Sequence, residues 1–433
     1  MIPKKFTPEP FPPMPRTIKP PVSPKNEAPQ ANLPWPHQRF LAASLVVVWL
    51  ALIVYGGSSL RQEGVMVNGQ ELAPTRCTFL VMNAATLTGF QQAIGISEFN
   101  PESHRGPTTV LTLILFGTFF TLVIGGLAVV RILRLNYSVW QVIGSAMLFQ
   151  FLASMAGAAA IIGHGRTLFD AIFQSAAAFG NCGLAIGPLS SVHEGATYVL
   201  LVLATLGGLG LPALMELYDA LWGLRSVSTH TRYVVRWTSA MYLLVFFVLL
   251  LFQWPQDDAN TWAPWKQAIA TSSVEALNTR TAGMHFEMID VLPRAAQWVL
   301  MVLMAMGASS AGSGGGIKST TFVQLWRGVH NALHGRPVRR EFGIAFVWVA
   351  IYFTIALAGL LTLLTLNSEI AADRMLFIVI SALSNVGLSH NPIAMVGPGL
   401  NVLSALMLLG RVAPLCILWW MAETTNDADL AVG

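Results

Sequence analysis

The chain has 433 residues, of which 54% are hydrophobic and only 11% are charged, and its mean hydropathy is +0.59. A globular domain usually has about 25% charged residues, so this composition excludes an ordinary water-soluble fold and indicates an integral membrane protein. The formal net charge of +4 could suggest a nucleic-acid partner. The basic residues gather in connections between apolar segments, however, which is typical of membrane topology, and we expect no nucleic acid.

Residues 1–37 are predicted to form a disordered, proline-rich tail. Twelve of the 24 prolines lie in this stretch, together with several lysines and few residues that could build a core. The first apolar run begins only near Phe40, which is too far along the chain for a cleaved signal peptide. We therefore expect the tail to stay attached, on the cytoplasmic side.

Eight apolar runs have the character of membrane spans, since about 20 residues at 1.5 Å each cross roughly 30 Å of hydrocarbon. They are 40–57, 110–133, 139–163, 198–221, 235–254, 298–306 (which continues beyond a break), 342–366 and 400–421. Four semi-apolar segments are too short to span and are typical of re-entrant helices: 75–85, 167–179, 264–277 and 371–383. The predicted fold class is an all-α integral membrane protein with about eight transmembrane helices and four re-entrant pore helices around a central pore.

These segments repeat four times in the same order. Each unit has an outward span, an outer loop, a short segment, a polar stretch and a returning span. The predicted units are 38–135, 136–226, 227–335 and 336–425, followed by a tail at 426–433. Arginines such as Arg131, Arg232 and Arg339 lie in the connections between units, so we place these connections in the cytoplasm.

A glycine ends the polar stretch of every unit: Gly89, Gly183, Gly283 and Gly387. A re-entrant helix ends inside the membrane, where its last carbonyls need water or protein as partners. The negative end of its dipole favours a cation, and glycine lets carbonyls turn toward an axis, as in ion filters. A single glycine would more often serve helix packing. Four at matched positions favour a cation pore.

The chain resembles the Trk/Ktr/HKT superfamily of potassium transporters, closest to the bacterial Trk/Ktr branch, over about residues 40–421. The resemblance rests on Thr86-Leu-Thr-Gly89, Gly180-Asn-Cys-Gly183, Asn278-Thr-Arg-Thr-Ala-Gly283, Asn385-Val-Gly387, the Gly207-Gly-Leu-Gly-Leu-Pro212 kink and Gly314-Gly-Gly-Ile-Lys318-Ser-Thr-Thr321. Glycine in all four filters goes with potassium selectivity in this family. The resemblance therefore implies a potassium uptake pathway in a bacterial inner membrane.

The resemblance also implies which residues bind the ion. The predicted filter consists of Thr86, Leu87, Thr88, Gly89, Gly180, Asn181, Cys182, Gly183, Thr281, Ala282, Gly283, Ser384, Asn385, Val386 and Gly387. Potassium, as the transported ion, is expected at the carbonyls of Thr88, Asn181, Thr281 and Asn385, and no other cofactor is expected. Three residues depart from the usual family pattern: Cys182, Met284 and His285.

The third returning span is interrupted at residues 307–316, which are almost all glycine and serine. Such a stretch cannot hold a helix, because each interior glycine costs about 1 kcal/mol relative to alanine. A phosphate-binding loop is disfavoured since Ile317 separates the glycines from Lys318. A glycine helix for close packing is the plainer alternative. The resemblance implies an intramembrane gating loop, with Gly312, Ser313, Gly314, Gly315, Gly316, Lys318 and Arg411 as gating residues.

Two arginines lie at predicted membrane depth, where a charge needs partners. Arg411, in the last span, should bind backbone carbonyls of the broken third span; the alternative is that it extends to the cytoplasmic headgroups. Arg280, inside the third polar stretch, cannot point into a cation pore. We expect it behind the filter, paired with Glu275.

Potassium uptake through a channel-like pore is thus the predicted function. The alternative is a sodium-permeable or sodium/potassium-coupled secondary transporter of the same superfamily, built from repeats and broken helices. No catalytic constellation is present, so we expect no enzymatic activity. The resemblance further implies a homodimer in the lipid bilayer that binds a cytoplasmic ring of nucleotide-binding regulatory subunits.

Overall fold

The computed structural model describes residues 35–66, 71–91, 99–100, 103–164, 166–186, 189, 194–254, 262–286, 289–367, 369–390, 395, 397–424 and 431–432. This part of the chain is helical between its loops, as predicted, with one isolated bridge between Met66 and Phe99. Six helices are long and apolar enough to cross a membrane. The predicted tail at 1–37 lies outside the described residues except for its last three, which begin the first helix.

The first two units have a long helix, a short helix and a returning helix. In the first these are α1 (Trp35–Leu60), α2 (Pro74–Ala85) and α3 (Arg105–Ile132); in the second they are α4 (Val139–Ile161), α5 (Leu168–Phe179) and a bent pair, α6 (Gly195–Leu209) and α7 (Leu211–Leu221). A one-turn helix, η2 (Ile162–His164), follows α4. The chain bends by 103° between α6 and α7, at the predicted kink.

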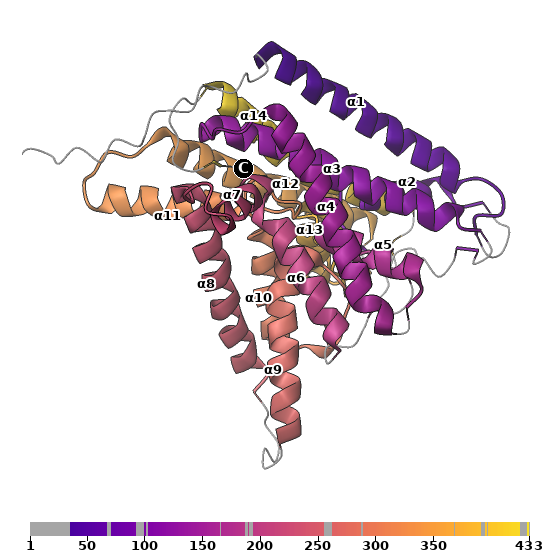
Figure 1. Ribbon diagram of the computed structural model, residues 1–433. Coiled ribbons are helices and arrows are strands. Elements are labelled where there is room, and N and C mark those ends of the chain that lie inside the picture. Colours follow the sequence, from indigo (N-terminus) through magenta and orange to yellow (C-terminus); the bar gives the residue numbers. More distant parts are fainter. Residues whose placement is uncertain are drawn as a thin grey trace, which may run out of the picture.

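The third and fourth units follow the same order. The third begins with α8 (Thr229–Phe252) and α9 (Trp262–Leu277), and α9 continues into the π-helix η3 (Asn278–Ala282). The one-turn helix η4 (Ile289–Val291) follows, and the returning span is broken into α10 (Arg294–Ala305) and α11 (Ser319–Leu333). The fourth has α12 (Arg340–Leu366), α13 (Ala372–Leu383) and α14 (Pro398–Thr424). Figure 1 shows α1 along one edge and α8 and α9 projecting together from the rest.

The prediction of eight spans needs a correction. Within the described residues, six helices are of spanning length and the bent α6–α7 pair makes a seventh candidate. The run at 298–306 belongs to α10, which has only 12 residues, about 18 Å at 1.5 Å per residue. The glycine and serine residues after Met306 end the helix there, so the third unit returns through a loop instead of a continuous span.

Local sequence explains where several of these helices begin. Ser138 and Gln141 form a capping box at the start of α4, and the Thr167 hydroxyl accepts the amide of Asp170 at the start of α5. Ser228 caps α8 in the same way through Thr231. Pro74 opens α2 at a position where its missing N–H costs nothing.

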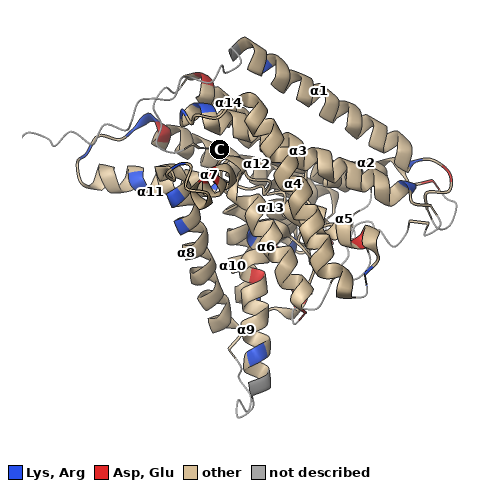
Figure 2. Ribbon diagram, in the orientation of Figure 1, with Lys and Arg blue, Asp and Glu red and all other residues tan. Residues whose placement is uncertain are grey.

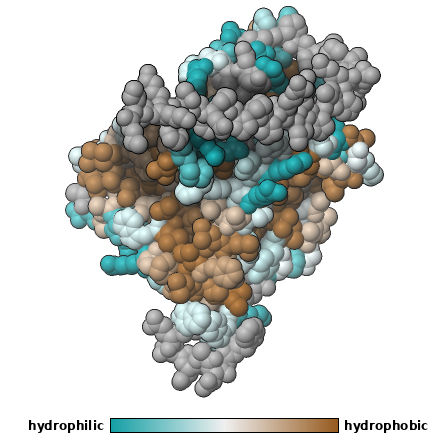
Figure 3. Space-filling model, turned by 90° about the vertical axis from the view of Figure 1, so that its left-hand side faces the viewer, coloured by the Kyte–Doolittle hydropathy of each residue, from teal (hydrophilic) through white to brown (hydrophobic). Residues whose placement is uncertain are grey.

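The outer helices face away from the core with apolar side chains. On α8, for example, Phe247 and Leu251 are 61% and 66% exposed, which suits contact with lipid tails. Figure 2 shows Lys and Arg mainly at helix ends and in connections, and Figure 3 shows a broad hydrophobic area on one face. Polar residues such as Asn83, Asn181 and Asn385 are instead fully buried at the ends of the short helices. Buried polar groups thus gather where the short helices end, within an otherwise hydrophobic core.

Candidate functional site

The four predicted filter glycines form a closed ring. A Cβ at Gly89 would clash with the backbone of Gly183, one at Gly183 with the carbonyl of Gly283, one at Gly283 with the carbonyl of Val386, and one at Gly387 with the carbonyl of Thr88. Each loop thus touches the next through its backbone, and the fourth returns to the first. Only glycine leaves room for this approach. The structure therefore brings four loops, separated by about a hundred residues in the chain, to one place.

Three of the short helices end in the same turn. At the end of α2, Leu87 N donates to Ala84 O and Thr88 N to Asn83 O; at α5 the same pattern joins Asn181 to Ala178 and Cys182 to Ala177, and at α13 it joins Asn385 to Ala382 and Val386 to Ser381. This is a Schellman motif, which needs a left-handed residue directly after the helix cap. Leu87, Asn181 and Asn385 occupy that position with φ of 57°, 54° and 49°. The shared turn delivers three loops to the ring with the same geometry.

The third loop reaches the ring by a different turn. Helix α9 widens into the π-helix η3, Gly283 N donates to Asn278 O over 3.0 Å, and the left-handed residue is Gly283 itself, with φ of 61°. A π-helix adds a residue to the turn and is frequent at functional sites. Thr281 and Ala282 lie inside this turn. The third filter stretch is thus locally wider than the other three.

Polar side chains at the short helices hold three of the loops, and sequence reasoning assigned a role to none of them. Asn83 Oδ1 accepts the amides of Gly89 and Phe90 over 2.7 and 2.9 Å, and its Nδ2 donates to the carbonyl of Phe90. Asn278 binds both backbone groups of Met284, and the Ser381 hydroxyl accepts Gly387 N over 3.0 Å. The available signal was a polar residue five or six positions before the glycine in these three loops.

Residues 307–316 form a compact, buried loop between α10 and α11, as the break in the sequence predicted. Gly307 N donates to Ile317 O, Ala308 N to Gly315 O and Ile317 N to Ala305 O, so the two ends of the loop are tied together. Ser309 N donates to Gly208 O, Ser313 N to Gly207 O, and Leu211 N to Ala311 O, at the α6–α7 bend. The loop therefore lies against the kinked second unit.

The loop also lies directly against the ring of filter loops. Ser313 Oγ donates to the carbonyl of Phe179 over 2.9 Å and accepts Asn181 Nδ2 over 2.7 Å. A Cβ at Gly315 would clash with Ser384 O, which begins the fourth filter stretch. Gly312, Gly314 and Gly316 are fully buried in the same loop, and Gly316 is left-handed with φ of 73°. No space for a side chain remains between loop and filter at Gly315.

Arg411 joins the loop to the first filter stretch. Its side chain is only 3% exposed, Nη1 donates to Ser313 O over 2.6 Å, and Nε donates to Thr86 O over 2.8 Å. Nη2 lies 3.4 Å from Leu87 O. Gly410 makes this possible, since a Cβ there would clash with Leu383 O at the end of α13. The predicted contact with carbonyls of the broken span is present, extension to the headgroups is excluded, and the two filter contacts were not foreseen.

The predicted pair of Arg280 with Glu275 is wrong. Both residues are described, and Arg280 Nε instead donates to Gly307 O and Nη2 to Thr238 Oγ1, each over 3.3 Å. Glu275 Oε2 accepts the hydroxyl of Thr279, four residues on. Side chains three or four apart share a helix face, whereas a separation of five does not keep them together. Arg280 thus supports the start of the buried loop from behind the third filter stretch.

Lys318 is 4% exposed, and its Nζ donates to Gly314 O over 2.5 Å, four residues earlier in the same loop. This hydrogen bond joins two parts of the same loop, and no contact described links Lys318 to a filter stretch. All predicted filter and gating residues lie in the described part of the chain, although nothing is described for the side chain of Thr281. Cys182 is fully buried.

Fold and site together define a multi-pass membrane protein in which four glycine-containing loops meet beside a buried glycine-rich loop. Residues 127–422, more than half of the chain, match the model of the TrkH family, described as cation transport protein. The chain belongs to this family, and its relatives make it a membrane subunit of the Trk/Ktr type.

Three comparisons illustrate the relationship. The chain is 28% identical over 275 residues to Ktr system potassium uptake protein B of Vibrio alginolyticus, and this match covers 59% of each chain. It is 21% identical over 425 residues to potassium/sodium uptake protein NtpJ of Enterococcus hirae, and this match covers 87% of this chain and 92% of NtpJ. It thus spans about three fifths of the length of the Ktr relative. The crystal structure of the potassium transporter TrkH from Vibrio parahaemolyticus has the same fold, with a TM-score of 0.68 and 17% identity over 88% of this chain and 84% of that one.

Proposed function

We propose that this protein carries potassium into the cell through a channel-like pore whose selectivity filter is the ring of four loops. The observation that carries the proposal is the closed sequence of backbone contacts from Gly89 to Gly183, Gly283 and Gly387. Rings of backbone carbonyls replace the hydration shell of a permeating ion. The potassium-binding carbonyls are those of Thr88, Asn181, Thr281 and Asn385. The names of the relatives, which are potassium uptake proteins, support the choice of ion.

The four units, with boundaries as predicted from the sequence, surround this pore as pseudo-repeats. Support comes from the recurrence of a long helix, a short helix and a glycine turn in each unit. Three of the four turns also share one hydrogen-bond pattern. The dipoles of the short helices α2, α5, α9 and α13 would point their negative ends toward the ring, which favours a cation there.

Residues 307–316 act as the gate in this proposal. The loop lies against filter stretches 1, 2 and 4 through Arg411, Ser313 and Gly315, and the side chains of this loop are buried. A loop in this place obstructs ions that leave the filter toward the cell interior. Opening requires that the bonds from the loop to Phe179, Asn181 and Gly208 break.

The protein is further proposed to lie in a bacterial inner membrane with its N-terminus in the cytoplasm, as a homodimer controlled by a separate nucleotide-binding subunit. Basic connections between the units support this orientation. The relatives are named as parts of a Ktr system, which supports a multi-component assembly. Exposed arginines near the start of α12, including Arg339, offer a surface for an acidic partner.

A pathway that also carries sodium is the second candidate. Two observations favour it: the relative NtpJ is named a potassium/sodium uptake protein, and the third loop reaches the ring through a wider π-helical turn. A wider turn changes the distance between opposing carbonyls and so the fit to a given ion. No enzymatic activity is proposed.

Ion replacement in proteoliposomes tests the function. Purified protein is reconstituted with potassium inside, and uptake of tracer rubidium is measured against external potassium, sodium or lithium. The proposal predicts that potassium competes with the tracer while sodium and lithium do not. Equal competition by sodium would support the second candidate, and no uptake above that of empty liposomes would contradict both.

A further inference from the structure

A groove of about 340 Å³ lies between α4 and α7, at the end of the molecule that carries the connections between units. None of its lining residues belongs to the ring, the buried loop or the contacts of Arg411. Its walls come from α4, α7 and the connections that precede α4 and follow α7. The lining residues are Tyr137, Gln141, Ser145, Leu148, Phe149, Met215, Tyr218, Asp219, Leu224 and Arg225.

The lining divides into an apolar and a polar end. Leu148, Phe149 and Met215 are aliphatic or aromatic, whereas Asp219 and Arg225 carry opposite charges. Tryptophans stand near the groove: Trp140 is 67% exposed at the start of α4 and Trp222 is 70% exposed after α7. Exposed tryptophans gather where a membrane meets water. The groove therefore crosses the boundary between lipid tails and headgroups.

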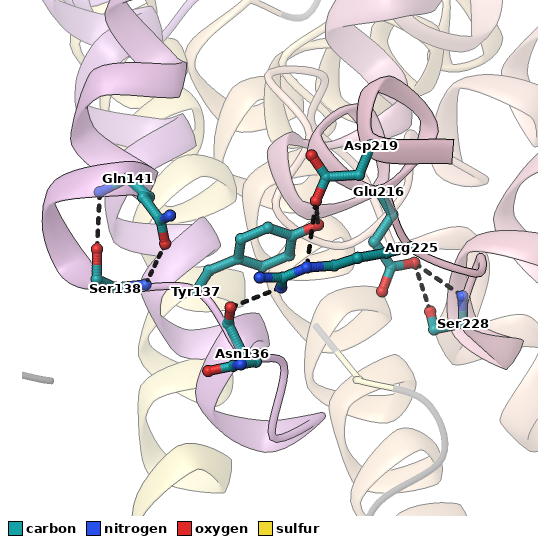
Figure 4. A network of polar contacts seen from close by, with 8 residues as sticks. All are labelled: Asn136, Tyr137, Ser138, Gln141, Glu216, Asp219, Arg225 and Ser228. Atoms are coloured by element: carbon teal, nitrogen blue, oxygen red, sulfur yellow. Dashed lines mark hydrogen bonds and ion pairs between the residues drawn. The ribbon is translucent and has the colours of Figure 1, made fainter. Parts of the chain in front are cut away.

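The two charges at the polar end are held side by side. Arg225 Nε lies 3.7 Å from Asp219 Oδ2, and the two side chains are 30% and 17% exposed. Tyr137 fixes both, because its hydroxyl donates to Asp219 Oδ2 over 2.8 Å and its ring lies 4.9 Å from the Arg225 guanidinium (Figure 4). Arg225 Nη1 also donates to Asn136 O over 2.7 Å. A positive and a negative group thus stand at fixed positions at the groove.

Tyr137 keeps its proton in this network. Burial, and then the hydrogen bond to Asp219, raise the pKa of the Tyr137 hydroxyl well above its usual value. The phenol is therefore a permanent donor to Asp219, which lies beside Arg225. Nearby, Glu216 accepts the amide and hydroxyl of Ser228 and fixes the connection that carries Arg225 (Figure 4).

We propose that this groove is a binding site for one phospholipid with a zwitterionic, primary-amine headgroup, that is, a phosphatidylethanolamine. The lipid phosphate binds Arg225, the ammonium binds the Asp219 carboxylate, and an acyl chain lies against Leu148, Phe149 and Met215. The charge pattern selects the headgroup. A phosphatidylglycerol would place its phosphate at Arg225 but bring no cation to Asp219, and a choline has no N–H to donate to the carboxylate.

Native mass spectrometry of the purified full chain in detergent tests the site. The protein is titrated with phosphatidylethanolamine, phosphatidylcholine and phosphatidylglycerol of identical acyl chains. The site predicts that ethanolamine lipid binds about 5-fold more tightly than the other two, since one well-placed ionic contact contributes about 1 kcal/mol. Equal binding of the three, or a preference for phosphatidylglycerol, overturns the proposal.

Variants locate the binding. Asp219→Asn should remove the preference for ethanolamine over glycerol lipid, and Arg225→Gln should weaken binding of both. Asp170→Asn, in the first turn of α5 and outside the groove, is the matched control and should leave the preference unchanged. Should the charge variants prove unstable in a melting assay, Leu148→Trp fills the apolar end and leaves both charges in place. It should abolish the preference, and a preference that survives it overturns the proposal.

Discussion

The first, second and fourth filter loops differ from the third in how they are built. Three loops leave their short helices through the same Schellman turn, with a left-handed Leu87, Asn181 or Asn385. The third leaves through a π-helix, and the helix that returns from it is broken at Met306. A turn geometry shared by three loops suits a fixed ring of carbonyls, whereas an irregular unit suits a part that moves. The comparison suggests that selection is distributed over the ring and gating is concentrated in the third unit.

Gly387→Ala should have the largest effect, because it inserts a Cβ into the carbonyl of Thr88 at a φ of 94°. A left-handed alanine alone costs about 1–2 kcal/mol, and the clash adds to it, so potassium uptake should fall about tenfold or more. Gly397→Ala is the control, since Gly397 has a φ of 64° but open space around it. Rubidium uptake in proteoliposomes measures both. A similar loss in the two variants would mean that backbone strain, not the ring, is responsible.

Removal of Gly312, Ser313 and Gly314 should come next. The deletion removes the bonds from Ser313 to Phe179, Asn181 and Gly207, and it removes the carbonyl that Arg411 binds. Loss of two or three such buried bonds costs the closed state several kcal/mol, so uptake should rise about tenfold or more. The initial rate of rubidium uptake into proteoliposomes measures the change. Shortened variants that conduct no faster than the parent would refute the assignment of the gate to the third unit.

Arg411→Gln should connect the two regions, because Arg411 binds both Ser313 O in the loop and Thr86 O in the first filter stretch. The shorter, neutral side chain cannot reach both. We expect faster uptake together with weaker discrimination against sodium, each by about 5-fold, as for a loss of about 1 kcal/mol. Competition by sodium against tracer rubidium measures the second change. A faster flux with unaltered selectivity would show that filter and gate are independent.

Arg280 and Glu275 should give the smallest effect. Arg280 donates to Gly307 O and Thr238 Oγ1, whereas Glu275 accepts from Thr279, and no bond described joins the two side chains. A double-mutant cycle of Arg280→Gln and Glu275→Gln, read out by thermal unfolding, should give a coupling energy below about 0.5 kcal/mol. A coupling above about 1 kcal/mol would restore the ion pair that the sequence suggested.

Much of the fold follows from patterns within short stretches of sequence. The apolar runs, the short semi-apolar segments and the break after Met306 depend on local composition, so their existence and order could be predicted. Burial of Arg411 also followed, because a charge in an apolar helix must find partners. These features need no knowledge of which segments meet.

The remaining features depend on contacts between distant segments or on turn geometry. Some hydrogen bonds join residues that are far apart in the chain: Ser309 and Gly208 are about 100 positions apart, and Arg411 and Thr86 about 325. No local sequence pattern predicts such bonds. The error at Arg280 arose because side chains five positions apart do not share a helix face, so Arg280 binds Gly307 and Thr238 instead. The role of Asn83 was missed because a polar residue in a short helix has many possible partners.

Anomalous diffraction from crystals grown in rubidium tests the central claim, that the ring of glycine turns is the ion filter, most directly. Rubidium resembles potassium in size and charge and gives an anomalous signal of its own. The proposal predicts rubidium peaks inside the ring formed by Gly89, Gly183, Gly283 and Gly387, against the carbonyls of Thr88, Asn181, Thr281 and Asn385. Ordered rubidium elsewhere in the protein, with none inside the ring, would contradict it.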